Sequence, residues 1–130
     1  MDRQQVVNWV AAYERAWRTP GTDTLGSIFT ESASYLQAPY AEPVLGLAAI
    51  AEMWEAERDG PAEIFELTSS IVAVDGDTAV VRAEVSYGPP TNQDFRDLWI
   101  IRFAEDGRCS AFEEWPFAPR EPATPVADGG

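Results

Sequence analysis

Histidine and lysine are both absent from this 130-residue chain, and cysteine occurs once, as Cys109. Without histidine the protein cannot form a Ser-His-Asp triad, a Cys-His pair or a histidine metal site. A single cysteine excludes an internal disulfide, and beside a turn in a predicted strand it favours a structural role. Any chemistry must come from carboxylates, tyrosines and arginines. We find no ligand spacing that indicates a metal, and we expect no cofactor.

Long apolar runs are missing as well. None approaches the ~20 residues of a membrane-spanning helix, and the N-terminal MDRQQVVNWV lacks the pattern of a signal peptide, so we expect a cytoplasmic protein. Acidic residues outnumber basic ones 22 to 9, which gives a formal net charge of −13. This charge disfavours nucleic-acid and membrane partners and favours a solubilising acidic surface. A cationic partner or substrate is the alternative.

The first half of the chain has mainly helical patterns. Apolar residues recur at helical spacing over residues 2–18, where Asp2 can cap the start, and again over residues 47–58. Between them we predict a short helix with Leu25, Ile28 and Phe29 on its buried side, and then a strand over residues 33–38. A rigid loop with two prolines follows at residues 39–43.

The second half is typical of an antiparallel sheet. Apolar and polar residues alternate over residues 62–74, 79–87, 94–103 and 108–117, separated by glycine turns or a polar loop. The alternation blurs at residues 71–74, which indicates either a bulge near Ser69 and Ser70 or burial on both faces. Residues 118–130 are rich in proline, alanine and glycine, which predicts a disordered tail after one domain of residues 1–117. The order predicts an α+β fold whose sheet curls beneath the N-terminal helices and leaves a conical cavity.

The candidate site lies on the last hairpin. Odd-numbered residues from Phe95 to Phe103 share a face that is apolar apart from Asp97, so we expect this carboxylate to point into the cavity. Burial raises the pKa of a carboxylate, which suits a general acid or base. Across the turn, Glu113 is the predicted second acid. A solvated or ion-paired role is the alternative for both.

The same hairpin sets the predicted inward and outward residues of the last strand. We expect Ala111, Glu113, Trp115 and Phe117 to face inward, and Phe112 and Glu114 to face outward. Aromatic residues from the whole chain are predicted to line the pocket, with core packing as the alternative. These residues are Tyr13, Trp17, Tyr40, Trp54, Tyr87, Trp99 and Trp115.

Three segments carry a resemblance to a known family: VVNWVAAYERAW, GLAAIAEMW and LWIIRFAEDGRCSAFEEW. Over about residues 2–117 the chain resembles the nuclear transport factor 2-like superfamily, in its SnoaL-like branch. The resemblance implies a cone-shaped, cystatin-like roll. It also implies a homodimer through the outer sheet face, for which we expect Val80, Leu98, Ile100 and Phe112 to supply apolar surface.

The resemblance leaves the function open, because this superfamily includes isomerases, cyclases, dehydratases, epoxide hydrolases and binding domains. We expect a pocket for a small hydrophobic molecule. The alternative is a cofactor-free isomerase- or cyclase-type enzyme with Asp97 as general acid or base, Glu113 as second acid, and Tyr13 or Tyr87 as hydrogen-bond donor. A third possibility is an interaction module whose cavity is filled by side chains.

Overall fold

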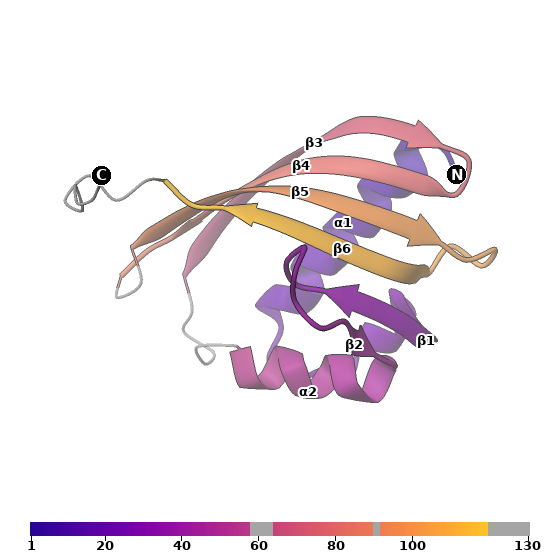
Figure 1. Ribbon diagram of the computed structural model, residues 1–130, viewed down its shortest axis with the longest axis horizontal. Coiled ribbons are helices and arrows are strands. Elements are labelled where there is room, and N and C mark those ends of the chain that lie inside the picture. Colours follow the sequence, from indigo (N-terminus) through magenta and orange to yellow (C-terminus); the bar gives the residue numbers. More distant parts are fainter. Residues whose placement is uncertain (58–63, 90–91, 120–130) are drawn as a thin grey trace.

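The computed structural model describes residues 1–57, 64–89 and 92–119 of the chain. Two α-helices, a 3-10 turn and six strands follow one another in these ranges (Figure 1). The elements are α1 (Arg3–Arg18), η1 (Leu25–Ser27), β1 (Phe29–Leu36), β2 (Val44–Leu45), α2 (Leu47–Glu57), β3 (Phe65–Asp75), β4 (Thr78–Tyr87), β5 (Gln93–Phe103) and β6 (Cys109–Phe117).

All six strands form one curled, unclosed sheet in the order β2-β1-β6-β5-β4-β3. Neighbouring strands are antiparallel except for β1 and β6, which are parallel. Figure 1 shows α1 lying across one face of the sheet, with α2 beside β1 and β2. The predicted α+β class with a curled sheet is confirmed. The parallel pair was not predicted, because the segments that form it are more than 70 residues apart in sequence.

Helix α1 begins at a capping box. The Asp2 side chain accepts a hydrogen bond from the Gln5 backbone N–H at 2.8 Å, and the Gln5 side chain accepts one from the Asp2 N–H at 2.9 Å. These bonds satisfy two backbone donors that a helix start leaves unpaired. Val6, Val10 and Tyr13 then recur on one side of the helix and are all buried against the sheet.

Aromatic side chains dominate the core between α1 and the sheet. The Tyr13 ring lies at its centre, with its centroid 5.1 Å from that of Trp99 and 5.4 Å from those of Trp54 and Phe112. These separations are typical of favourable aromatic contacts. Tyr13 thus links α1 to α2 and to two strands of the sheet through ring contacts.

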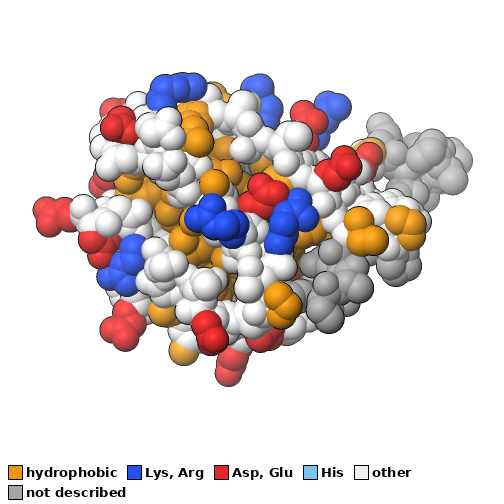
Figure 2. Space-filling view, turned by 180° about the vertical axis from the view of Figure 1, so that it is seen from behind, with side chains coloured by type: hydrophobic (Ala, Val, Ile, Leu, Met, Phe, Trp, Pro, Cys, Tyr) orange, Lys and Arg blue, Asp and Glu red, His pale blue; other side chains and the backbone are white. Residues whose placement is uncertain are grey.

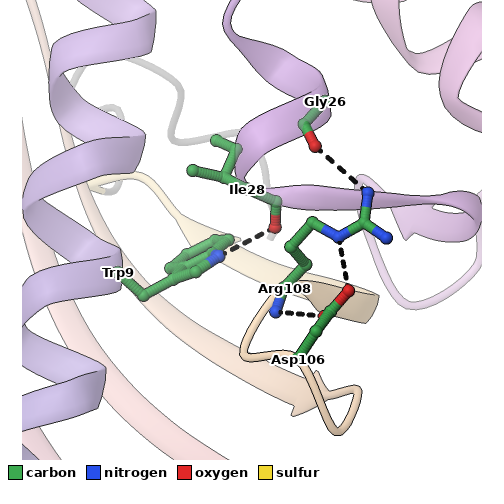
Figure 3. A network of polar contacts seen from close by, with 5 residues as sticks. All are labelled: Trp9, Gly26, Ile28, Asp106 and Arg108. Atoms are coloured by element: carbon green, nitrogen blue, oxygen red, sulfur yellow. Dashed lines mark hydrogen bonds and ion pairs between the residues drawn. The ribbon is translucent and has the colours of Figure 1, made fainter.

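A polar network joins the segment around η1 to both α1 and the β5–β6 turn (Figure 3). The Trp9 indole N–H donates to the Ile28 carbonyl at 2.9 Å, and an Arg108 guanidinium N–H donates to the Gly26 carbonyl at 3.2 Å. Arg108 also binds Asp106 at 2.9 Å, and hydrogen bonds from its backbone and side chain lower the pKa of that exposed carboxyl. This network ties the η1 segment to α1 and to the β5–β6 turn.

Some of the predicted boundaries are wrong. The short helix near Leu25 is only a 3-10 turn, and β1 begins at Phe29 rather than Ala33 because Phe29 is fully buried and pairs with Cys109. The β3 irregularity lies at Val72, between the pairs Ile71–Val81 and Ala73–Val80, rather than near Ser69. The predicted tail from residue 120 onward and Arg58 lie outside the described residues.

A second bulge reverses the predicted faces of β6. Phe103 pairs with Cys109 and Arg102 pairs with Ala111, so Ser110 is one extra residue on β6. Beyond such a residue every side chain moves to the opposite face from the one that simple counting across the turn gives. Phe112 and Glu114 therefore face the concave side, and the predicted inward set that contained Glu113 and Trp115 is wrong.

Charged side chains of both signs share the surface. Figure 2, seen from the side opposite to that of Figure 1, shows basic and acidic side chains next to one another near the centre of this face, and hydrophobic atoms between polar ones. The helices in the described ranges are too short or too polar to span a membrane.

Candidate functional site

A cavity with a volume of about 320 Å³ lies between the two helices and the concave face of the sheet. Its wall is largely aromatic and aliphatic: Tyr13, Trp17, Met53, Phe65, Leu67, Val85, Tyr87, Phe95, Trp99 and Pro116. The polar side chains in the wall are those of Glu14, Tyr35, Gln37, Glu57, Asp97 and Glu114. A mainly apolar hollow with a few convergent polar groups is the usual form of a small-molecule site.

Asp97 is the one charged residue among the described ones that is buried, with 4% of its surface exposed. Alternation along β5 places it on the concave face beside Trp99, whose indole N–H donates to Asp97 Oδ2 at 3.3 Å. Oδ1 is buried and accepts no hydrogen bond from an N–H or O–H donor of the described residues when the nearby carboxyls are ionised. Such an atom is costly unless a donor is supplied to it.

Glu114 supplies a second carboxyl to the same part of the cavity. It pairs with Trp99 across the sheet, whereas Asp97 pairs with the next inward residue, Pro116. Burial, followed by the hydrogen bond to Asp97 and the charge of that residue, raises the pKa of Glu114 to about 9, against a partial lowering by the Trp99 N–H. Glu114 therefore keeps its proton at neutral pH and can donate it to Asp97.

Two tyrosine hydroxyls form a second polar group in the wall. Tyr13 and Tyr35 lie on α1 and β1, and their oxygen atoms are 2.8 Å apart. Burial is the main reason that the pKa of each lies well above 10, so both stay protonated at neutral pH. One of the two hydrogens makes the bond between them. The other has no partner among the described residues and can be donated to a ligand.

The remaining predicted aromatic residues are divided among the cavity, the core and the surface. Trp17 and Tyr87 line the cavity together with Tyr13 and Trp99. Trp54 is fully buried behind the wall, with its ring centroid 5.0 Å from that of Trp17. Tyr40 is fully exposed, because the loop that holds it turns its ring away from the protein. Tyr40 and Trp54 are thus absent from the described wall.

Glu113 and Trp115 lie on the outer face of the sheet, as the Ser110 bulge requires. The Trp115 indole N–H donates to the Glu113 carboxylate there, and Glu113 borders a shallow depression with Ile100 and Arg102. The second acid beside Asp97 is therefore Glu114 and not the predicted Glu113. Trp115 correspondingly packs beside Leu98 and is separated from the cavity by the sheet.

Sequence reasoning missed Glu114 and Tyr35 as site residues. The alternation of Tyr35 with Ser34 and Leu36 in a predicted strand could have indicated its face of the sheet. Its hydroxyl contact with Tyr13 on α1 could not be predicted, because it depends on how the helix packs on the sheet. Glu114 carried no separate signal, because it follows another glutamate in the sequence. In the part of the chain that the structure describes, no three acidic or cysteine side chains are grouped as metal ligands would be.

The sequence matches the SnoaL-like domain over residues 10–112. No curated protein matches it. Among solved structures, it is similar to a protein of Jannaschia sp. CCS1 provisionally assigned as a SnoaL-like polyketide cyclase, with 20% identity, coverage of 89% of this chain and 90% of that one, and a TM-score of 0.71.

Two further structures show the same architecture. A protein of Sinorhizobium meliloti, provisionally assigned as a polyketide cyclase, is 27% identical over 82% of this chain and 93% of that one, with a TM-score of 0.64. A protein of Kribbella flavida, provisionally assigned as a ketosteroid isomerase, is 19% identical over 94% of this chain and 84% of that one, with a TM-score of 0.66. These likenesses agree with the resemblance that the three sequence segments carry.

Proposed function

This chain belongs to the SnoaL-like domain family, and on that premise we propose that its cavity binds a small, largely apolar molecule that carries a hydrogen-bonding group. The observation that carries the proposal is the Asp97 carboxyl, buried beside Glu114 in the wall of an otherwise apolar hollow. A ligand that donates to Asp97 adds a hydrogen bond to a buried carboxyl that accepts one N–H, from Trp99, among the described residues. The free hydrogen of the Tyr13–Tyr35 pair supplies a donor for an oxygen atom of the same ligand.

A ligand that binds only the folded protein raises its melting temperature, so a thermal-shift screen of small hydrophobic metabolites tests this proposal. Val85 lines the cavity, and its neighbour Ser86 is exposed on the other side of the same strand. We expect Val85→Trp to fill the cavity and abolish the shift caused by any hit, and Ser86→Trp to retain it. Equal shifts in both variants would place binding outside the cavity.

The hydrogen bond between Asp97 and Glu114 favours a second candidate, a cofactor-free isomerase- or cyclase-type reaction. Two neighbouring carboxyls can act as base and acid in one step. Asp97 is then the group that accepts a proton from the ligand, and Glu114 is the group that returns one. The free hydroxyl hydrogen of the tyrosine pair holds the ligand oxygen that gains charge.

A compound that the protein turns over would test this role. We expect Asp97→Asn and Glu114→Gln each to lower kcat by about 10²–10⁴-fold, the usual contribution of general acid–base catalysis. Glu113→Gln is the matched control, because Glu113 neighbours Glu114 in sequence but lies on the other face of the sheet. Full activity in Asp97→Asn would contradict a proton-carrying role.

The outer sheet face supports a proposed homodimer. Val80, Leu98, Ile100 and Trp115 face outward there, and Leu98 is 37% exposed. Phe112, which was expected in this group, is buried on the concave side. We expect Leu98→Glu to shift the sedimentation coefficient from dimer to monomer without unfolding the chain. A wild-type protein that sediments as a monomer at high concentration would contradict the proposal.

A cytoplasmic location stays a prediction.

A further inference from the structure

The polar part of the cavity wall is acidic. Four carboxyl groups line it from four different elements: Glu14 on α1, Glu57 on α2, Asp97 on β5 and Glu114 on β6. No arginine lines the cavity among the residues that the structure describes, and lysine and histidine do not occur in the chain. Even with Glu114 protonated, the wall carries several negative charges and no lining side chain of opposite sign.

Arg18 is a basic side chain that contacts two residues of this wall, and its charge is balanced by an ion pair with Glu14. Its Nε lies 2.9 Å from Glu14 Oε2, and its guanidinium lies over the Phe65 ring, 4.0 Å from the centroid. The ion pair leaves Glu57 and Asp97 without a counter-ion from Arg18. The stacking on Phe65 shows that a cation can be accommodated against the aromatic residues of this wall.

The burial of Asp97 strengthens the effect of its charge. Asp97 is only 4% exposed, and its Oδ1 accepts no hydrogen bond from an N–H of the described residues. A buried carboxylate is most favourable when a hydrogen-bonded cation accompanies it, and a neutral ligand would supply the hydrogen bond without the charge.

We propose that the ligand of this cavity is a cation, namely a small aromatic or aliphatic molecule with an amino group that is protonated at neutral pH and donates to Asp97. The aromatic rings of Tyr13, Tyr87 and Trp99 supply faces that attract such a group and apolar area for the rest of the molecule. Carboxylates and phosphates are disfavoured, because they would meet Glu57 and Asp97 with the same sign of charge. This inference rests on the proposed binding function.

Three matched probes separate charge from shape: 4-phenylbutylamine, 4-phenylbutan-1-ol and 4-phenylbutanoate. They share an apolar body and differ in whether the end group is positive, neutral or negative. Isothermal titration at pH 7 and physiological salt gives Kd for each. We expect the amine to bind at least about tenfold more tightly than the alcohol and the carboxylate to bind most weakly, where tenfold corresponds to ~1.4 kcal/mol.

Variants assign the preference to particular residues. Asp97→Asn keeps the side-chain volume and removes the charge, so we expect the ratio of alcohol to amine Kd to fall to about one while the alcohol Kd changes less than about twofold. Glu57→Gln removes a more exposed carboxylate of the same wall and is expected to lower the ratio by a smaller factor, which keeps the test available if Asp97→Asn fails to fold. Glu113→Gln, on the outer face, is expected to leave the ratio unchanged.

The outcomes distinguish this inference from the function on which it rests. If the alcohol binds as tightly as the amine, or the carboxylate binds best, the cationic ligand is overturned while binding in the cavity stands. An amine preference that survives both Asp97→Asn and Glu57→Gln also overturns the inference, because the charges of this wall would not cause it. If none of the three probes binds, both proposals fail together.

Discussion

Trp99 donates to Asp97 inside the cavity, and Trp115 donates to Glu113 on the outer face of the next strand, so the β5–β6 hairpin repeats one arrangement on its two sides. In both pairs an indole N–H reaches a carboxylate two residues earlier on the same strand. Inside, Asp97 and Trp99 are 4% and 2% exposed, whereas the outer pair is partly accessible to solvent. The two pairs therefore have the same local geometry in different dielectric surroundings.

The difference shows that the indole–carboxylate pair does not by itself set the protonation state of the acids around it. Asp97 has a second acid beside it, and burial together with the interaction with Asp97 keeps a proton on Glu114 at neutral pH. Glu113 precedes Glu114 in the chain, but it lies on the outer face of the sheet, in a depression that Arg102 also lines. Because side chains alternate along a strand, adjacent glutamates face the cavity and the outer surface.

The largest contrast is expected when each tryptophan is truncated. Trp99→Ala should lower the free energy of unfolding by about 3–5 kcal/mol, because it removes a buried ring that contacts Tyr13 and Phe112 and leaves a void. Trp115→Ala should cost roughly 1 kcal/mol, because its ring is only partly buried. Urea unfolding of the two variants measures both, at a protein concentration where the chain is monomeric. Equal losses would show that the outer pair is as deeply packed as the inner one.

The pH dependence of stability is expected to separate Glu114 from Glu113. The folded-state pKa of Glu114, about 9, lies above its ordinary value of 4.5, so the folded protein binds more protons than the unfolded chain between these pH values. The stability that this group contributes is complete below pH 4.5 and is lost as the pH rises toward 9. The slope from one such group is at most about 1.4 kcal/mol per pH unit, and the opening of the cavity to solvent makes it smaller.

Glu114→Gln should therefore flatten the decline of unfolding free energy between pH 6 and pH 8, relative to the wild type, by up to about that slope. Glu113→Gln, the same substitution one residue earlier, should leave the decline in place. Urea unfolding at several pH values gives the comparison. A decline that Glu113→Gln flattens as much as Glu114→Gln would contradict the assigned faces of β6.

The smallest contrast concerns single hydroxyl groups on the two sides of the sheet. Tyr35→Phe removes the hydrogen bond to Tyr13 in a buried setting and should cost about 1–2 kcal/mol. Ser86→Ala removes a 2.7 Å bond to Asp94 on the exposed side, where water replaces it, and should cost less than about 0.5 kcal/mol. Thermal and urea unfolding test both. A neutral effect of Tyr35→Phe would mean that water already satisfies the Tyr13 hydroxyl.

Local patterns in the sequence were sufficient for much of the fold. The capping residue Asp2, the helical spacing in α1 and the alternation along β4 and β5 depend on neighbours within a few residues, and the structure shows each of them. Asp97 stood out for the same reason, as a carboxylate in an apolar alternating set that now lines the cavity. When a strand pairs without a bulge, its own alternation of apolar and polar residues predicts which side chains face the core.

The sequence by itself determined the two α-helices, the four long strands β3 to β6, the curled α+β sheet and the presence of an acid on its concave face, because periodicity and turn residues act over short distances. The tertiary structure alone decided that Glu114 accompanies Asp97. Ser110 is an extra residue only in relation to Phe103 and Arg102 on the opposite strand, so the inward side of β6 is undefined until the two strands pair. The raised pKa of Glu114 likewise depends on burial and on Asp97 across the sheet, and neither is present in the unpaired strand.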